Sequence, residues 1–196
     1  MAIDDPEPAG ATPLDEEERR HLKPVHITTR DELNEWEQAN IADAYEWALA
    51  RGRRPPLLSD TYVRRLHKMM FDKTWKWAGT YRTTEKNIGI PQWQINEQVR
   101  ILCDNTRHQI DNTKVDPDRL AAEFHHRLVE IHPFPNGNGR HARLMTDVLL
   151  RSLGREPFSW GGANLEDIGE ARQRYLEALR AGDHGDIELL LRFARS

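Results

Sequence analysis

The sequence predicts an all-α domain, mostly helical, that carries one short β-hairpin. Apolar residues recur every three or four positions in several segments, which is the spacing of amphipathic helices. Residues 75–95 differ, because glycines and a proline interrupt a series of β-forming residues there, and this pattern is typical of a hairpin. A glycine-rich stretch between two helical segments indicates a tight loop that opens a new helix. The fold class follows from these three observations.

The N-terminal part combines an irregular arm with a first helix. Residues 1–24 carry several prolines and an acidic run, so we expect them to lie irregularly on the domain. Thr29, with Glu32 three residues later, forms a capping box. A helix over about residues 29–51 is therefore expected, and it ends before Gly52.

The other helices follow from the same periodicity and from their start and stop signals. Pro117 marks one start clearly, and Gly154 marks one end. The helical segments that we expect after the first are about residues 60–70, 96–111, 118–130, 138–153, 165–180 and 186–195.

The composition limits the classes of function. A chain of 196 residues is most simply one domain, and its net charge of −4 argues against a nucleic-acid partner. No apolar run approaches the roughly 20 residues that a membrane span needs. The first residues do not resemble a signal peptide, and the single Cys103 excludes an internal disulfide. We therefore expect a cytoplasmic protein without a membrane partner.

The loop that starts at His132 reads His-Pro-Phe-Pro-Asn-Gly-Asn-Gly-Arg. Two glycines flank Asn138, which suits a backbone that approaches a ligand closely. Free N–H groups at the start of a helix bind anions, and Arg140 and Arg143 add permanent positive charge one turn apart. The unperturbed pKa of histidine suits proton transfer near neutrality. The loop is therefore predicted to hold phosphate groups, with a general base at its rim.

These residues resemble the signature of the Fic family, His-Pro-Phe-x-Asp/Glu-Gly-Asn-Gly-Arg-x-x-Arg, with Asn136 at the acidic position. Three further segments, residues 10–15, 32–41 and 75–82, resemble the Fic subgroup called mobile mystery protein B. The resemblance implies the Fic/Fido fold, with a single Fic domain over residues 25–196. The hairpin would then be the flap that holds a segment of the target protein.

The resemblance also implies an activity. The chain would be a protein adenylyltransferase that transfers AMP from ATP to a Ser, Thr or Tyr hydroxyl of a target protein, with His132 as the general base. Mg²⁺ would be the cofactor, held with ATP near Asn136. The residues expected to hold the phosphates are Gly137, Asn138, Gly139, Arg140 and Arg143, and those expected in the flap are Ile88, Gly89 and Ile90.

Asn136 leaves a second function open. An amide oxygen is a poorer ligand for Mg²⁺ than a carboxylate. The chain could instead be a nucleotide-binding regulatory or toxin-like module with weak or altered transfer. The subgroup resemblance adds a small companion protein as a potential partner.

Many members of the family carry an inhibitory helix whose glutamate pairs with the second arginine of the signature. The helix over about residues 29–51 lies where such an element belongs, although its residues match the motif imperfectly. Glu37 is the expected inhibitory residue and Arg143 its expected partner. Glu32 is the alternative, but it also reads as a helix cap.

Overall fold

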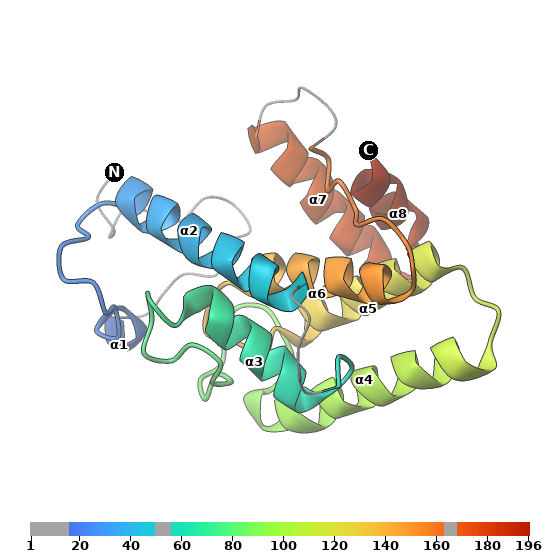
Figure 1. Cartoon of the computed structure of the whole chain (residues 1–196), viewed down its shortest axis with the longest axis horizontal. Coiled ribbons are helices and arrows are strands. Elements are labelled where there is room, and N and C mark those ends of the chain that lie inside the picture. The colour runs from blue at the N-terminus through green and yellow to red at the C-terminus, as the bar shows by residue number, and fades with distance from the viewer. Residues whose placement is uncertain (1–15, 50–55, 163–167) are drawn as a thin grey trace.

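Two antiparallel helices, α5 (Pro117–Ile131) and α6 (Asn138–Ser152), lie at the centre of the molecule and are joined by the signature loop (Figure 1). The structure is a computed structural model that describes residues 16–49, 56–162 and 168–196. The Asp116 side chain caps α5 by accepting the backbone N–H of Arg119 at 3.1 Å, and Pro117 occupies the first turn. Because α5 and α6 pack against each other, they fix both ends of the loop.

The N-terminal helices cover one side of this pair. Helix α2 (Arg30–Leu49) packs on α3 (Asp60–Phe71), and both contact α6. The capping box of α2 is confirmed, because the Glu32 carboxylate accepts the backbone N–H groups of Thr28 and Thr29 at 2.9 and 3.0 Å. These contacts lower the pKa of Glu32. Glu32 is therefore a cap, and it is not placed to inhibit the loop.

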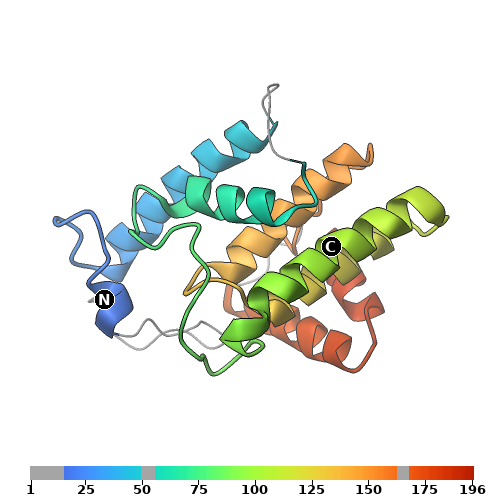
Figure 2. The same cartoon turned by 90° about the horizontal axis from the view of Figure 1, so that it is seen from below.

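Helix α4 (Ile95–Asn112) runs alongside α5, as Figure 2 shows from below. The short 3₁₀ helix η1 (Gln92–Gln94) leads into it, and the arm predicted over residues 1–24 is described only from α1 (Glu16–Arg19) onward. The main core lies between α2, α3, α4, α5 and α6, and its fully buried large side chains include Phe71, Trp75 and Phe134.

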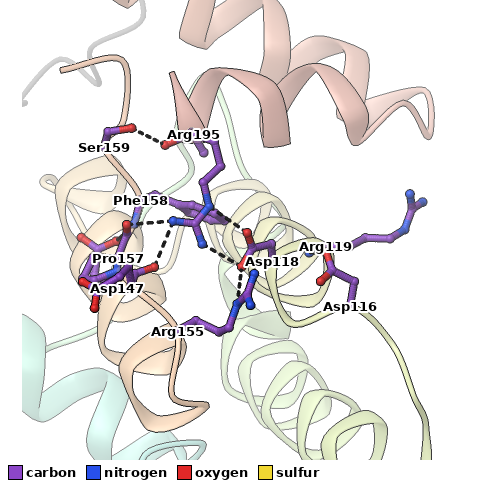
Figure 3. Close-up of polar contacts among 11 residues, drawn as sticks. Asp116, Asp118, Arg119, Asp147, Arg155, Pro157, Phe158, Ser159 and Arg195 are labelled. Atoms are coloured by element: carbon purple, nitrogen blue, oxygen red, sulfur yellow. Dashed lines mark hydrogen bonds and ion pairs between the residues drawn. The ribbon is translucent and has the colours of Figure 1, made fainter. Parts of the chain in front are cut away.

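Helices α7 (Ile168–Asp183) and α8 (Glu188–Arg195) pack on each other, and both contact α5 (Figure 1). Figure 3 shows the polar contact that fixes α8: Asp118 accepts hydrogen bonds from Arg195 at 2.7 and 2.8 Å. Arg155 donates to the same carboxylate at 3.2 Å, and both arginines lower the pKa of Asp118. The Asp118 side chain is 14% exposed, whereas those of Arg195 and Arg155 are 32% and 48% exposed, so solvent partly screens the contact.

The all-α class is confirmed, but the predicted hairpin is wrong. Within residues 16–49, 56–162 and 168–196 the structure forms no strand, and its isolated β-bridge pairs Leu22 with Trp75. The β-forming residues of this stretch differ in their environment: Trp75, Trp77 and Tyr81 pack into the core, whereas Ile88 and Trp93 are exposed. Carbonyl groups of this segment accept hydrogen bonds from a side chain, Arg82, in place of a cross-strand ladder.

The described helices lie close to the predicted ranges. Residues 50–55, which follow α2, and residues 163–167, which precede α7, lie outside the described part of the chain. Among the described helices, none combines the length and the apolar composition that crossing a bilayer requires.

Candidate functional site

The signature loop begins and ends with left-handed residues. His132, at the end of α5, has φ 53°, and Gly137, before α6, has φ 76°. A Cβ at position 137 would lie 2.6 Å from the ring of Phe71, so glycine is required there for space as well as for backbone conformation. Phe134 between them is fully buried and anchors the loop in the core.

Asn138 closes the loop on itself. Its Oδ1 accepts the backbone N–H of Phe134 at 2.9 Å, and its Nδ2 donates to the Phe134 carbonyl at 2.8 Å. One of the two N–H groups of this amide is thus used within the loop, and the other is available to a ligand. The backbone N–H groups of Asn138 and Gly139 lie in the first turn of α6, so the prediction that Asn138 binds phosphate stays a prediction. No side chain caps α6, so its first turn presents backbone donors and the positive end of the helix dipole.

His67, which the sequence analysis missed, supports the loop from α3. Its ring stacks on Phe134 with 3.6 Å between centroids. The Gly79 N–H donates to its Nδ1 at 3.0 Å, so Nε2 carries the proton and donates to the Asn136 carbonyl at 3.2 Å. Burial lowers the pKa of His67 and keeps it neutral. Its position on the apolar face of α3, four residues before Phe71, was the available signal.

Asn136 turns its side chain toward the loop backbone. Its Oδ1 accepts the Gly137 N–H at 2.6 Å. This single neutral oxygen is a weak candidate ligand for Mg²⁺, which favours carboxylates together with phosphate oxygens. Among the residues that the structure describes, no group of three or more His, Cys, Asp and Glu side chains could hold a metal ion. The loop thus fits a cation held mainly by the phosphates of a bound nucleotide.

His132 is 5% exposed, and burial lowers the pKa of its imidazole to about 4. The positive charge of Arg82 lowers it further, while a hydrogen bond with the Val129 backbone opposes the shift. The ring is therefore neutral at neutral pH and able to accept a proton. An anionic ligand beside it would raise its pKa toward the range that suits a general base.

Glu37 pairs with the first arginine of the loop. Its Oε2 lies 2.5 Å from Nη1 of Arg140, and its Oε1 accepts the indole N–H of Trp75 at 2.6 Å. The Glu37 side chain is 5% exposed and that of Arg140 is 35% exposed. The predicted pairing of Glu37 with Arg143 is therefore wrong.

The rotation of α6 explains the difference. Positions three residues apart differ by about 60° around a helix, so the two arginines point to different neighbours. Arg140 lies over the ring of Phe71 on the α2–α3 side, with 5.0 Å from its guanidinium carbon to the centroid. Arg143 lies over the ring of Tyr175 on α7, at 4.9 Å.

A cluster of buried polar side chains lies around Arg143, and the sequence analysis did not predict it. The Tyr175 hydroxyl is hydrogen-bonded to His125 Nε2 at 2.9 Å. Burial, reinforced by Arg143, lowers the pKa of His125 to about 3, so the imidazole is neutral. One turn beyond Arg143, burial raises the pKa of Asp147 to about 6, although the N–H groups of Trp160 and Phe158 oppose the shift (Figure 3). Because these residues come from three different helices, no local sequence pattern indicated the cluster.

The segment Ile88–Gly89–Ile90, predicted as the flap, lies beside His132 although it forms no hairpin. A Cβ at Gly89 would lie only 2.6 Å from the Cβ of His132. Ile88 is 44% exposed at this edge. An extended target segment bound here would be next to the imidazole, so the predicted position of the flap fits the site.

Comparison with known proteins identifies similar sequences. Residues 57–150 match the Fic/DOC family model. A stretch of 121 residues is 40% identical to the protein adenylyltransferase Fic of Nematostella vectensis, covering 59% of this chain and 26% of that protein. A stretch of 120 residues is 30% identical to the protein adenylyltransferase fic-1 of Caenorhabditis elegans, covering 59% and 22%. The chain thus spans about a quarter of the length of these curated relatives.

Solved structures share the fold. BepC of Bartonella tribocorum, solved with bound AMPPNP, superposes with a TM-score of 0.68 at 18% identity, covering 92% of this chain and 97% of that chain. Fic-1 of Caenorhabditis elegans superposes with a TM-score of 0.63 at 22% identity, covering 88% and 50%.

Proposed function

Because the chain belongs to the Fic/DOC family through residues 57–150, we propose that it is a protein adenylyltransferase that transfers AMP from ATP to a hydroxyl of a target protein. The activity named for the relatives from two animals supports the proposal. One observation carries it: a buried, neutral His132 lies one loop before the uncapped start of α6, where Arg140 occupies the first turn.

The chemistry follows from the positions of these groups. His132 accepts the proton of a Ser, Thr or Tyr hydroxyl of the target, and the hydroxyl oxygen attacks the α-phosphorus of ATP. The bond from that phosphorus to the bridging oxygen breaks, and pyrophosphate leaves. The first-turn N–H groups of α6, including those of Asn138 and Gly139, bind the phosphates, and Arg140 and Arg143 neutralise charge on the departing ones. Mg²⁺ bound with ATP would supply further charge neutralisation near Asn136.

The ion pair between Glu37 and Arg140 supports autoinhibition as part of this proposal. The second carboxylate oxygen of Glu37 accepts the indole N–H of Trp75, and this hydrogen bond fixes the carboxylate against the guanidinium of Arg140. A phosphate that needs Arg140 must displace this carboxylate. The domain therefore rests in a state with lowered affinity for the nucleotide, and α2 is the inhibitory element.

Asn136 favours a second function, a nucleotide-binding regulatory or toxin-like module that transfers little AMP. The neutral amide, whose oxygen already accepts the Gly137 N–H, offers weak support for a metal. Such a module would keep the anion site at α6 and would act through a small companion protein. Only transfer of AMP separates the two functions, since both bind ATP.

Transfer is measured with ATP labelled at the α-phosphate, with the protein alone and with a cell lysate. Label on protein is expected with wild type, more with Glu37→Gln, and none when His132→Ala is added. The matched control is His108→Ala, which removes an exposed histidine from α4 and should keep the label. Binding of ATP without any label, in Glu37→Gln as well as in wild type, would refute the transferase and support the module.

A further inference from the structure

Arg82 is a buried cation that donates to three backbone carbonyls. Its Nε donates to the His132 carbonyl at 2.7 Å, its Nη1 to the Thr84 carbonyl at 3.0 Å, and its Nη2 to the Ile90 carbonyl. Its own backbone N–H donates to the Pro133 carbonyl at 2.9 Å. The side chain is only 1% exposed. Arg82 thus contacts the start of the signature loop and also both ends of residues 84–90, the segment that lies beside this loop.

The charge of Arg82 is not explained by an ion pair. Its carboxylate neighbour, Glu85, lies 3.9 Å away and is 56% exposed, so it compensates the buried charge poorly. Burying a guanidinium in this way is costly unless its donors are satisfied, and a fork of five donors can bind several carbonyls at fixed angles. The arrangement is therefore suited to holding backbone in place.

The held segment touches the histidine directly. Gly89 has φ 100°, and a Cβ there would lie 2.6 Å from the Cβ of His132 and 2.8 Å from Nη2 of Arg82. His132 itself has φ 53°, a conformation that is strained for a residue other than glycine and persists only when its surroundings enforce it. The bond from Arg82 to the His132 carbonyl is a contact that enforces it.

We propose that Arg82 is a positioning residue that sets the distance between the imidazole of His132 and the backbone of Ile88–Ile90, on which the target segment would bind. The proposal rests on the proposed function for the identity of that ligand, but the positioning itself concerns only this chain. Its guanidinium acts on His132 in a second way, because its charge, with that of Lys86, favours the neutral imidazole.

Two substitutions separate geometry from charge. Arg82→Lys keeps a cation but loses the planar fork, whereas Arg82→Met loses both. The matched control is Arg107→Gln on α4, which also removes an arginine that donates to a backbone carbonyl, that of Leu58, away from the loop. Circular dichroism verifies that each variant is folded.

The first measurement is the NOE between the α-protons of Gly89 and the β-protons of His132 in the full chain, which the close approach of the two residues predicts. Both Arg82 variants should lose or strongly weaken this NOE, because the bonds of the guanidinium fork to the segment are lost, while Arg107→Gln should match wild type. The second is the pKa of His132 by NMR titration, which should rise in Arg82→Met and rise less in Arg82→Lys. If Arg82→Met does not fold, the NOE in Arg82→Lys decides alone.

A wild-type NOE between Gly89 and His132 in a folded Arg82→Lys would overturn the proposal. Where transfer is detectable, kcat should fall by about 100-fold with little change in the KM for ATP, since the phosphates bind at α6 rather than at Arg82. A rise in the KM for ATP as large as the fall in kcat would show that Arg82 has a general structural role, and it would overturn the positioning proposal. A wild-type protein that transfers no AMP, together with loss of the NOE between Gly89 and His132 in the variants, would refute the proposed function alone.

Discussion

Glu37→Gln tests the inhibitory pair with the smallest change in shape. The amide of glutamine is similar in size to the carboxylate, and its oxygen can still accept the Trp75 N–H, so the packing of α2 is kept. The substitution removes the charge opposite Arg140, and it places there an amide NH2 group, which cannot accept a hydrogen bond from the guanidinium. Folding should change little, because Arg140 is 35% exposed and water solvates it when unpaired.

The size of the effect follows from the pair. Charges about 4 Å apart attract by roughly 4 kcal/mol at an effective dielectric constant of about 20. The 35% exposure of Arg140 reduces this attraction, and a phosphate has to desolvate the same guanidinium. We therefore expect a net competition of about 1.4 kcal/mol, which tightens ATP binding roughly tenfold.

Titration calorimetry measures the change with ATP and, as a ligand control, with AMP. Glu37→Gln should bind ATP more tightly, whereas AMP, which lacks the outer phosphates, should bind equally to both proteins. Glu35→Gln is the matched control, because Glu35 lies on the same helix but is exposed. An unchanged Kd for ATP in a folded Glu37→Gln would refute the idea that Glu37 competes with phosphate.

Three further predictions test the loop, the contact between α5 and α8, and the support of the second arginine. Asn136→Asp should tighten ATP binding only with Mg²⁺ present, because a carboxylate binds this cation better than an amide; calorimetry with and without the metal measures it. Asp118→Asn should lower the free energy of unfolding in urea at about pH 7 by about 1–2 kcal/mol, because hydrogen bonds to charged groups are lost. The folded pKa of Asp118 is depressed, so its contribution is present above the unfolded pKa of about 3.9 and is lost as pH falls through the folded value. The difference between variant and wild type should therefore be smaller at about pH 2 than at about pH 7. Tyr175→Leu should weaken ATP binding more than Tyr175→Phe, measured as Kd, because only phenylalanine keeps a ring under Arg143.

Each of the three has a result that contradicts it. An equal gain for Asn136→Asp without Mg²⁺ would mean that position 136 does not face the metal. A loss of stability in Asp118→Asn that is the same at both pH values would exclude the carboxylate charge as its cause. Equal ATP affinity in the two Tyr175 variants would mean that the ring does not hold Arg143 in place.

Local signals made most of the helices predictable. Pro117 at the start of α5, the capping box at Thr29 and the glycines of the loop act within one turn of the chain, so their residues reveal them directly. The hairpin predicted between Trp75 and Ile95 was wrong, because composition alone does not show whether β-forming residues pair as strands: Trp75, Trp77 and Tyr81 are buried in the core, whereas Ile88 and Trp93 are exposed.

The sequence alone determined the chemistry of the loop: a histidine, two glycines and two arginines in a fixed order before and within one helix. Only the tertiary structure decided which partners these side chains have. Glu37 meets Arg140 across 103 positions, Arg143 turns to Tyr175, and Arg82 binds the carbonyl of His132. The reason is geometric, because the rotation of α6 and the packing of α2 and α7 beside it set these contacts, and no short stretch of residues contains that information.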